Sequence, residues 1–222
     1  MGNIWFTSDT HYGHKNIVRG TSEWESVQRV RDFDTVEGMN EDMIFKFNSL
    51  VKPDDELWHL GDWSFGGHAN IKIFRERINC KNIHLIFGNH DQHIEPINSP
   101  YRSLFLSCDY YKELSFKIHA ANAGKYGKTH IILSHYAMRV WNRSHHGSIM
   151  LYGHSHGTLD ELSPNITNPT WVGDQYFIRN FRTMDVGVDT NNLYPYHLDE
   201  IISIMKNRDV CMEVDHHNQN TN

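Results

Sequence analysis

The chain has 222 residues, of which 39% are hydrophobic and 12% aromatic, and its 27 acidic and 21 basic side chains give a formal net charge of −6. This length and composition predict a folded globular protein with a substantial core. The acidic balance argues against strong binding to duplex nucleic acid, which depends on neutralising phosphates with basic side chains, and against binding to a membrane surface.

Two further features of the composition bear on location and chemistry. The three cysteines, Cys80, Cys108 and Cys211, are odd in number and widely spaced, so they predict neither a disulfide framework nor a zinc knuckle. We found neither a secretory signal pattern nor an apolar run of membrane-spanning length, and we expect a cytoplasmic protein. Histidine is unusually frequent, with 17 copies, many of them close to Asp, Asn or Gly.

The first 60 residues predict a strand, a helix and a second strand. The strands are the short apolar runs Ile4–Thr7 and Glu56–Leu60, each of which ends beside polar residues. Between them, apolar residues recur at helical spacing from Val36 to Leu50. Asp34 and Glu37 are spaced as in a capping box, which predicts that the helix begins at that point.

The middle of the chain predicts a second helix, a third strand and a hairpin. The helix is expected over Ala69–Ile78 and the strand over Ile83–Phe87. The runs Leu114–His119 and Thr129–Ser134 are expected to pair as a hairpin, because the segment between them contains two glycines.

The last third predicts two strands and a helix with polar segments between and after them. Strands are expected over Ser148–Tyr152 and Thr183–Val188, and a helix that begins near Asp199. Residues 163–173 are rich in Pro, Asn and Thr and predict a long loop. Residues 215–222 are polar and predict a disordered tail.

Alternation of strands with helices favours an α/β fold with a mixed sheet. We therefore expect residues 1–214 to form a single domain, followed by the tail.

Polar residues follow five of the predicted strands directly. Because ligands of α/β proteins collect at the carboxyl ends of strands, these residues are expected to converge. Glycines beside them would allow close approach of backbone and ligand. The residues are Asp9 and His11, Asp62, Asn89 to Asp91, His135, and His154 and His156.

This set of side chains indicates metal chemistry. Carboxylate, amide and imidazole donors together suit a divalent transition metal such as Mn, Fe, Co, Ni or Zn. The set exceeds what one ion requires, whereas two ions that share a carboxylate would use all of it and could clamp a phosphoryl group. Two divalent ions beside Asp9 and Asp62 would leave a local positive charge that attracts phosphate.

The same motifs resemble the calcineurin-like metallophosphoesterase superfamily, whose pattern is D-x-H, G-D, G-N-H-D/E, a lone H and G-H-x-H. The longer strings "SDTHYGHKNI", "DELWHLGDWSFG" and "VGVDTNNLYPYHLDEI" are similar to short stand-alone phosphoesterases of bacteria and phages. The resemblance implies a four-layer αββα sandwich of two mixed sheets, with a dimetal site at the rim where the strands end.

The resemblance also implies roles for individual residues. His90 would donate a proton to the leaving group, and Asp91 would orient a neighbour or cap the following turn rather than bind metal. The implied ligands are Asp9, His11 and His156 for the first ion, Asn89, His135 and His154 for the second, and Asp62 as the bridge between them.

Two residues outside the motifs are candidates for substrate contact. His14 follows the first ligand loop and could face the substrate phosphate, although a solvated position is an open alternative. Arg139, four residues after His135, could make a charge-assisted contact with an oxyanion.

The sequence thus predicts a phosphoesterase with two divalent ions, manganese first among the candidates, in which a metal-bridging hydroxide attacks phosphorus. Analogy with the G-N-H-D members of this superfamily favours a phosphodiester substrate, as does the absence from "GDWSFGG" of the second Asp and the Arg of the Ser/Thr protein phosphatases. The alternatives are a nonspecific phosphomonoesterase and a catalytically inactive binding scaffold of the same fold. The physiological substrate, the native metal and the oligomeric state stay open.

Overall fold

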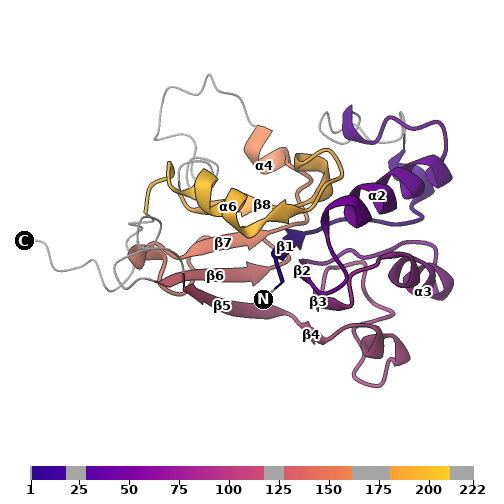
Figure 1. Ribbon diagram of the computed structural model, residues 1–222, viewed down its shortest axis with the longest axis horizontal. Helices are drawn as coiled ribbons and strands as arrows, with labels where there is room; N and C mark the ends of the chain where they lie inside the picture. The colour runs from indigo at the N-terminus through magenta and orange to yellow at the C-terminus, as the bar shows by residue number, and fades with distance from the viewer. Residues whose placement is uncertain (1, 19–28, 118–127, 162–180, 211–222) are drawn as a thin grey trace, which may run out of the picture.

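The structure is a computed structural model that describes residues 2–18, 29–117, 128–161 and 181–210 (Figure 1). The predictions for the loop 163–173 and the tail 215–222 lie outside these ranges.

The first sheet contains five strands in the order β4-β3-β2-β1-β9. Strands β1 to β4 pair in parallel, and β9 joins β1 antiparallel at the edge. The strands are β1 (Ile4–Thr7), β2 (Glu56–His59), β3 (Asn82–Ile86), β4 (Ser107–Asp109) and β9 (Tyr196–His197).

The second sheet contains four strands in the order β5-β6-β7-β8. The antiparallel pair β5–β6 confirms the predicted hairpin pairing, with Leu114 opposite Ile131, and β7 and β8 add in parallel. The strands are β5 (Tyr111–Lys117), β6 (Lys128–Ser134), β7 (Ile149–Tyr152) and β8 (Thr183–Asp185).

Four α-helices and four short 3₁₀ helices are described. The α-helices are α2 (Val36–Leu50), α3 (His68–Arg77), α4 (Thr158–Glu161) and α6 (Leu198–Met205). The 3₁₀ helices are η1 (Lys15–Ile17), η2 (Pro100–Leu104), η3 (Ser144–His146) and η5 (Val188–Thr190).

The core has layers because successive side chains of a strand point to opposite faces of the sheet. In β1, Trp5 belongs to the cluster that includes Phe47 of α2 and Phe74 of α3. Its neighbour Phe6 belongs to a second cluster with Leu133 and Leu151 of the other sheet. The first sheet is therefore buried on both faces, and Figure 1 shows α2 and α3 on its side away from β5, β6 and β7.

The outer face of the second sheet has a thinner cover. Ile132 and Met150 pack there with Trp141 of the segment after β6 and with the half-buried Leu159 of α4. Together with α2 and α3 on the opposite side, this cover gives the layered sandwich of two mixed sheets that the sequence predicted.

The start of α2 differs from the prediction. The N-cap is Thr35, one residue after Asp34, and its Oγ1 accepts a hydrogen bond from the backbone N–H of Gly38 at 3.1 Å. The threonine hydroxyl thus satisfies one of the free N–H groups of the first turn, a role that an aspartate carboxylate also fills at other helix starts. At the other end, Leu50 is 37% exposed, so the predicted apolar face stops at Phe47, which is fully buried.

Two strand boundaries differ by three residues. Strand β5 begins at Tyr111, three residues before the expected start, and exposed side chains alternate with half-buried ones along it. Strand β8 ends at Asp185 rather than Val188, because the Asp185 carboxylate turns back to accept the Gly187 N–H at 2.7 Å.

Within the described ranges, no helix has both the length and the apolar character that a membrane span requires.

The cluster between the sheets should dominate stability. Leu151 is fully buried there, so Leu151→Ala should lower the free energy of unfolding by about 2–5 kcal/mol through lost burial and a residual cavity. The matched control Leu50→Ala, at the exposed end of α2, should change it by about 0.5 kcal/mol or less. Chemical denaturation of the metal-free protein measures both, and similar losses would contradict this assignment of the core.

Candidate metal centre

Both sheets deliver polar side chains to one rim of the sandwich. Asp9, Asp62 and Asn89 follow β1, β2 and β3 of the first sheet. His135 follows β6, and the His154–His156 pair follows β7, in the second sheet. The convergence that the strand ends predicted is therefore present.

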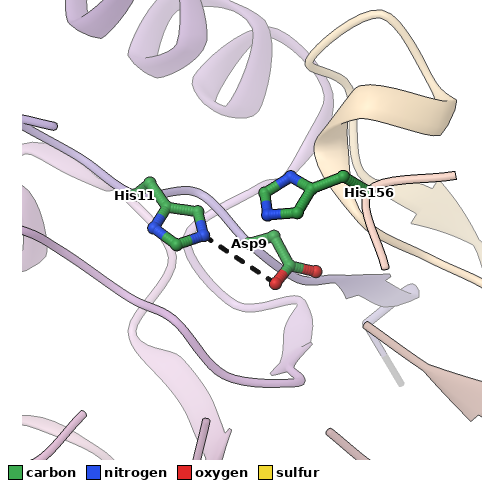
Figure 2. A group of neighbouring side chains, drawn as sticks. All are labelled: Asp9, His11 and His156. Carbon is green, nitrogen blue, oxygen red and sulfur yellow. Dashed lines mark ion pairs between the residues drawn. The ribbon is translucent and has the colours of Figure 1, made fainter. Parts of the chain in front are cut away.

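The first group consists of Asp9, His11 and His156 (Figure 2). Each offers one ligand atom, and these atoms all lie within 4.8 Å of one another. Their side chains are almost fully buried, and Figure 2 shows both imidazole rings beside the Asp9 carboxylate.

His11 provides a test of whether a metal fits this group. Neither ring nitrogen of the buried His11 has a hydrogen-bond partner among the described residues. Its Nε2 lies 4.0 Å from Asp9 Oδ1 and 3.4 Å from Asp62 Oδ2. Because a buried polar atom without a partner is costly, an imidazole so placed among carboxylates matches the requirements of a metal ligand.

The second group consists of Asp62, His135 and His154, and Asn89 joins it. Asn89 Oδ1 lies 3.0 Å from both His135 Nε2 and His154 Nδ1. Asp62 and His135 are buried, whereas His154 and Asn89 are exposed. This group therefore opens toward solvent, unlike the first.

Asp62 lies between the two groups. Its Oδ2 is 3.4 Å from His11 Nε2 of the first group and 3.7 Å from His135 Nε2 of the second. Its other oxygen, Oδ1, accepts the backbone N–H of His90 at 2.9 Å. A carboxylate in this position is able to serve two ions at once.

The backbone at these residues is in the left-handed region. The φ angles are +54° at Asp9, +45° at His11, +58° at Asp62, +70° at His154 and +49° at His156. Such angles cost about 1–3 kcal/mol each in non-glycine residues and persist only where surrounding structure enforces them. One enforcing contact is direct, since the backbone N–H of His154 donates to both Asp9 carboxylate oxygens at 3.0 and 2.9 Å.

Buried carboxylates fix the loops that carry the ligands. Asp91 accepts the N–H groups of Gly88, Asp62 and Trp63 at 2.8, 2.9 and 3.0 Å, so it orients its neighbours as the resemblance implied. Asp185 accepts the Gly157 N–H at 2.8 Å as well as that of Gly187, and so ties the loop after β7 to the end of β8.

Glycine is required where these loops come closest. A Cβ atom at Gly153 would collide with Ser8 Oγ and with the Asp9 carboxylate. One at Gly88 would collide with the Asp62 carboxylate and its backbone N–H. These two contacts are the close approaches that the sequence analysis expected of the glycines beside the ligands.

The sequence analysis missed two residues behind the first group. Arg31 is fully buried and forms an ion pair with Asp189, whose carboxylate also accepts a hydrogen bond from His156. Asp189 follows β8 just as the recognised ligands follow their strands, so the same strand-end rule would have found it. Nothing in the sequence distinguishes Arg31 from an exposed arginine.

His90 and His14 lie beside the first group. The exposed His90 and the half-buried His14 both pack on Phe65, with ring centroids 4.6 and 3.8 Å from it, and each is 5.5 Å from the His11 ring. Burial lowers the pKa of His14 to about 4, so its ring is neutral near pH 7. A pocket of about 60 Å³, lined among others by Phe65 and Gln92, opens beside His90. Arg139 is exposed, and its contact with substrate stays a prediction.

The imidazoles of the two groups differ in their affinity for protons. Burial lowers the pKa of His11, His135 and His154, and the nearby Asp62 carboxylate opposes this shift only in part at His135 and His154. Burial also acts to lower the pKa of His156, but the hydrogen bond to Asp189 and the charges of Asp9 and Asp189 outweigh it and raise the pKa. A proton therefore competes with a metal most effectively at His156.

Comparison with known proteins identifies relatives of the whole domain. The sequence model of the family described as calcineurin-like phosphoesterase matches residues 2–189. The Gene 66 protein of Mycobacterium phage D29 is 28% identical over 188 residues, which cover 78% of this chain and 86% of the phage protein. The uncharacterized protein MJ1445 of Methanocaldococcus jannaschii is 26% identical over 211 residues, 93% of each chain.

A solved structure shares the fold. The crystal structure of AQ665, a protein of unknown function from Aquifex aeolicus, superposes with a TM-score of 0.55 at 17% sequence identity. The superposition covers 92% of this chain and 100% of the Aquifex chain.

The pKa shifts of the ligand histidines predict that metal affinity depends on pH differently in the first and second groups. Imidazoles must be neutral to bind a metal. At the second group the lowered pKa values keep His135 and His154 neutral below the ordinary histidine value of about 6.5, so metal affinity there should persist at about pH 6. At the first group His156 takes up a proton as the pH falls through its raised pKa, so metal affinity there should weaken first. Calorimetric titration of metal-free protein with Mn²⁺ at several pH values measures both affinities. A parallel decline at the two positions would contradict the assignment.

Proposed function

The chain belongs to the calcineurin-like phosphoesterase family, a family of metal-dependent phosphoester hydrolases, and we propose that it hydrolyses a phosphodiester with two divalent ions. The proposed ligands of the first ion are the first group, Asp9, His11 and His156. Those of the second ion are Asn89, His135 and His154, and Asp62 bridges the two.

The position of Asp62 carries this proposal. Asp62 approaches an imidazole of both groups, so its carboxylate would contribute a ligand to each of the two ions. When bound, a pair of divalent ions supplies charge stabilisation for the phosphoryl oxygens and a water of lowered pKa. The mixed oxygen and nitrogen donors suit Mn²⁺ and also admit Fe, Ni, Co or Zn.

His90 is the proposed general acid. Its backbone N–H is fixed by Asp62 Oδ1, while its side chain is exposed and packs on Phe65 beside the 60 Å³ pocket. A histidine beside the two groups would be able to protonate a departing oxygen, and the pocket would offer space for the group that departs. His14 and Arg139 are the proposed contacts to the remaining phosphate oxygens.

A diester is favoured over a monoester by the G-N-H-D motif and by the absence of the protein-phosphatase Asp and Arg after Asp62. The fully buried Trp63 follows Asp62 directly and packs on Phe74 and Phe105, so this segment is part of the core rather than an extended charged surface. A nonspecific phosphomonoesterase is the runner-up. An inactive scaffold is disfavoured because every ligand position of the family pattern is filled.

A substrate panel tests the proposal. Metal-free protein is supplied with Mn²⁺, Ni²⁺, Co²⁺, Mg²⁺ or Zn²⁺ and assayed on a bis-aryl diester, an aryl monoester, and linear and cyclic nucleotides. We expect turnover that requires metal and is faster on diesters. Faster monoester hydrolysis with every metal would favour the runner-up, and metal binding without any hydrolysis would favour the scaffold.

If His90 is the general acid, its loss should slow esters with poor leaving groups more than esters with good ones. General acid catalysis typically contributes about 10²–10⁴-fold, and most where the leaving oxygen is a poor leaving group. His90→Asn should therefore lose rate in that range on an ester with an alkyl or ribosyl leaving group. It should lose much less on a nitrophenyl ester, whose phenolate leaves without a proton, and should keep both metals.

The matched control is His93→Asn. His93 is also exposed and lines the same pocket, but its ring packs on His68, 4.4 Å away between centroids. His93→Asn should keep the wild-type ratio between the rates on the alkyl or ribosyl ester and on the nitrophenyl ester. If His90→Asn instead loses one metal and slows both esters equally, His90 is a ligand and another residue supplies the proton.

A further inference from the structure

We infer that Arg31 and Asp189 form a buried positioning pair that sets the metal affinity of the first group, and of that group alone. The inference rests on the proposed metal function, because it concerns the ligands named there. It adds two residues that the family motifs do not include.

The pair is close and entirely enclosed. Arg31 Nε donates to Asp189 Oδ1 at 2.6 Å and Nη2 donates to Asp189 Oδ2 at 2.8 Å, a two-point contact between a guanidinium and a carboxylate. Both side chains are 0% exposed. A buried ion pair is often no more stabilising than apolar side chains of similar volume, because desolvation offsets the attraction. A contribution to folding stability is therefore a weak explanation for the presence of this buried pair. The other contacts of Arg31 and Asp189 supply a stronger explanation.

Asp189 fixes the orientation of His156. Its Oδ2 lies 2.6 Å from His156 Nδ1. The two-point contact with the Arg31 guanidinium favours the ionised form of the Asp189 carboxylate. An ionised carboxylate only accepts hydrogen bonds, so Nδ1 carries the proton and Nε2 keeps its lone pair. Figure 2 shows that other nitrogen directed toward Asp9 and His11.

Arg31 holds the other two ligands of the group through the backbone. Nη2 donates to the carbonyl oxygen of Asp9 at 2.6 Å and Nη1 to that of Thr10 at 3.1 Å. These carbonyl groups lie between Asp9 and His11, which both have left-handed backbone. One guanidinium therefore restrains the D-x-H loop of the first sheet and, through Asp189, the His156 ring of the second.

The second group is held differently. His135 Nδ1 lies 2.7 Å from the carbonyl oxygen of Leu60, a neutral backbone acceptor, and His154 is exposed and contacts Asn89. None of the hydrogen bonds described for Arg31 reaches His135 or His154. Loss of the pair should therefore affect one position only.

The need to neutralise the Arg31 charge near a cation site also explains why Arg31 occurs together with Asp189. An arginine this close to a cation site would repel the cation, but Asp189 neutralises it within the pair. Asp189→Asn keeps the shape, removes the charge that orients His156 and leaves Arg31 uncompensated. Loss of such an outer partner of a metal-bound histidine typically lowers metal affinity about 10–100-fold, and we expect a loss of that size at the first position.

The experiment measures Mn²⁺ and Co²⁺ affinity of the full chain by calorimetry, with Co²⁺ absorption as a second readout. Asp189→Asn is introduced into two backgrounds. His154→Ala disables the second position and His156→Ala the first. The expected loss is about 10–100-fold in the His154→Ala background and none in the His156→Ala background. Arg31→Lys, which keeps the charge without the two-point contact, should give a smaller loss in the same background.

The control is Glu41→Gln, which breaks a two-point pair with Arg77 on the surface. It should leave both metal affinities unchanged. Equal losses in both backgrounds, or no loss in either, would overturn the inference while a wild type that binds two ions keeps the proposed function. A wild type that binds no metal would overturn the proposed function itself.

A measurement on the unaltered protein guards against a variant that fails to fold. Long-range ¹H–¹⁵N NMR of the metal-free wild type should show His156 with its proton on Nδ1, and addition of Zn²⁺ should shift Nε2. A proton on Nε2 in the metal-free protein at neutral pH would overturn the inference, because Asp189 would then not orient the ring.

Discussion

The left-handed backbone at Asp9, His11, Asp62, His154 and His156 is the constraint around which this site is organised. A chain that leaves a strand in this conformation turns at once, so the ligand side chains stay at the sheet rim instead of following the strand direction. Each such residue carries a cost of about 1–3 kcal/mol that must be offset elsewhere. The offset lies in buried hydrogen bonds that Asp91 and Asp185 accept from backbone N–H groups, and in those that Arg31, paired with Asp189, donates to the backbone of the first loop.

Each of these buried carboxylates joins a different pair of segments at the rim. Asp91 joins the loops after β2 and β3, Asp185 joins the loop after β7 to the end of β8, and Asp189 with Arg31 joins the first loop to His156. Each therefore connects segments that are distant in the sequence. Burial raises the pKa of Asp91 to about 7 in spite of its three N–H donors, which indicates that the cost of desolvating this carboxylate outweighs the effect of those hydrogen bonds on its pKa.

Much of this arrangement could be predicted from the sequence, because it depends on local pattern. Apolar runs locate seven of the nine described strands and the side chains that gather at their ends, and the two groups assemble as expected. The short strands β4 and β9 were not predicted. The capping of α2 by Thr35 rather than Asp34 could not be predicted, since both residue types are favoured at the N-cap and Asp is, if anything, the more favoured of the two. The role of Arg31 depends on contacts 158 positions apart in the chain, and no local pattern reports whether an arginine is buried. The exposure of His154 and the burial of its partner His156 are likewise set by packing.

Each proposed metal position takes ligands from both halves of the sandwich. Asp9 and His11 come from the first sheet and His156 from the second, while Asp62 and Asn89 face His135 and His154 across the same boundary. An ion in either position would therefore cross-link the two sheets, comparable to a disulfide in what it joins. Because a ligand that binds only the folded state stabilises it in proportion to the logarithm of its concentration, metal bound at these positions would also protect the folded protein against proteolysis.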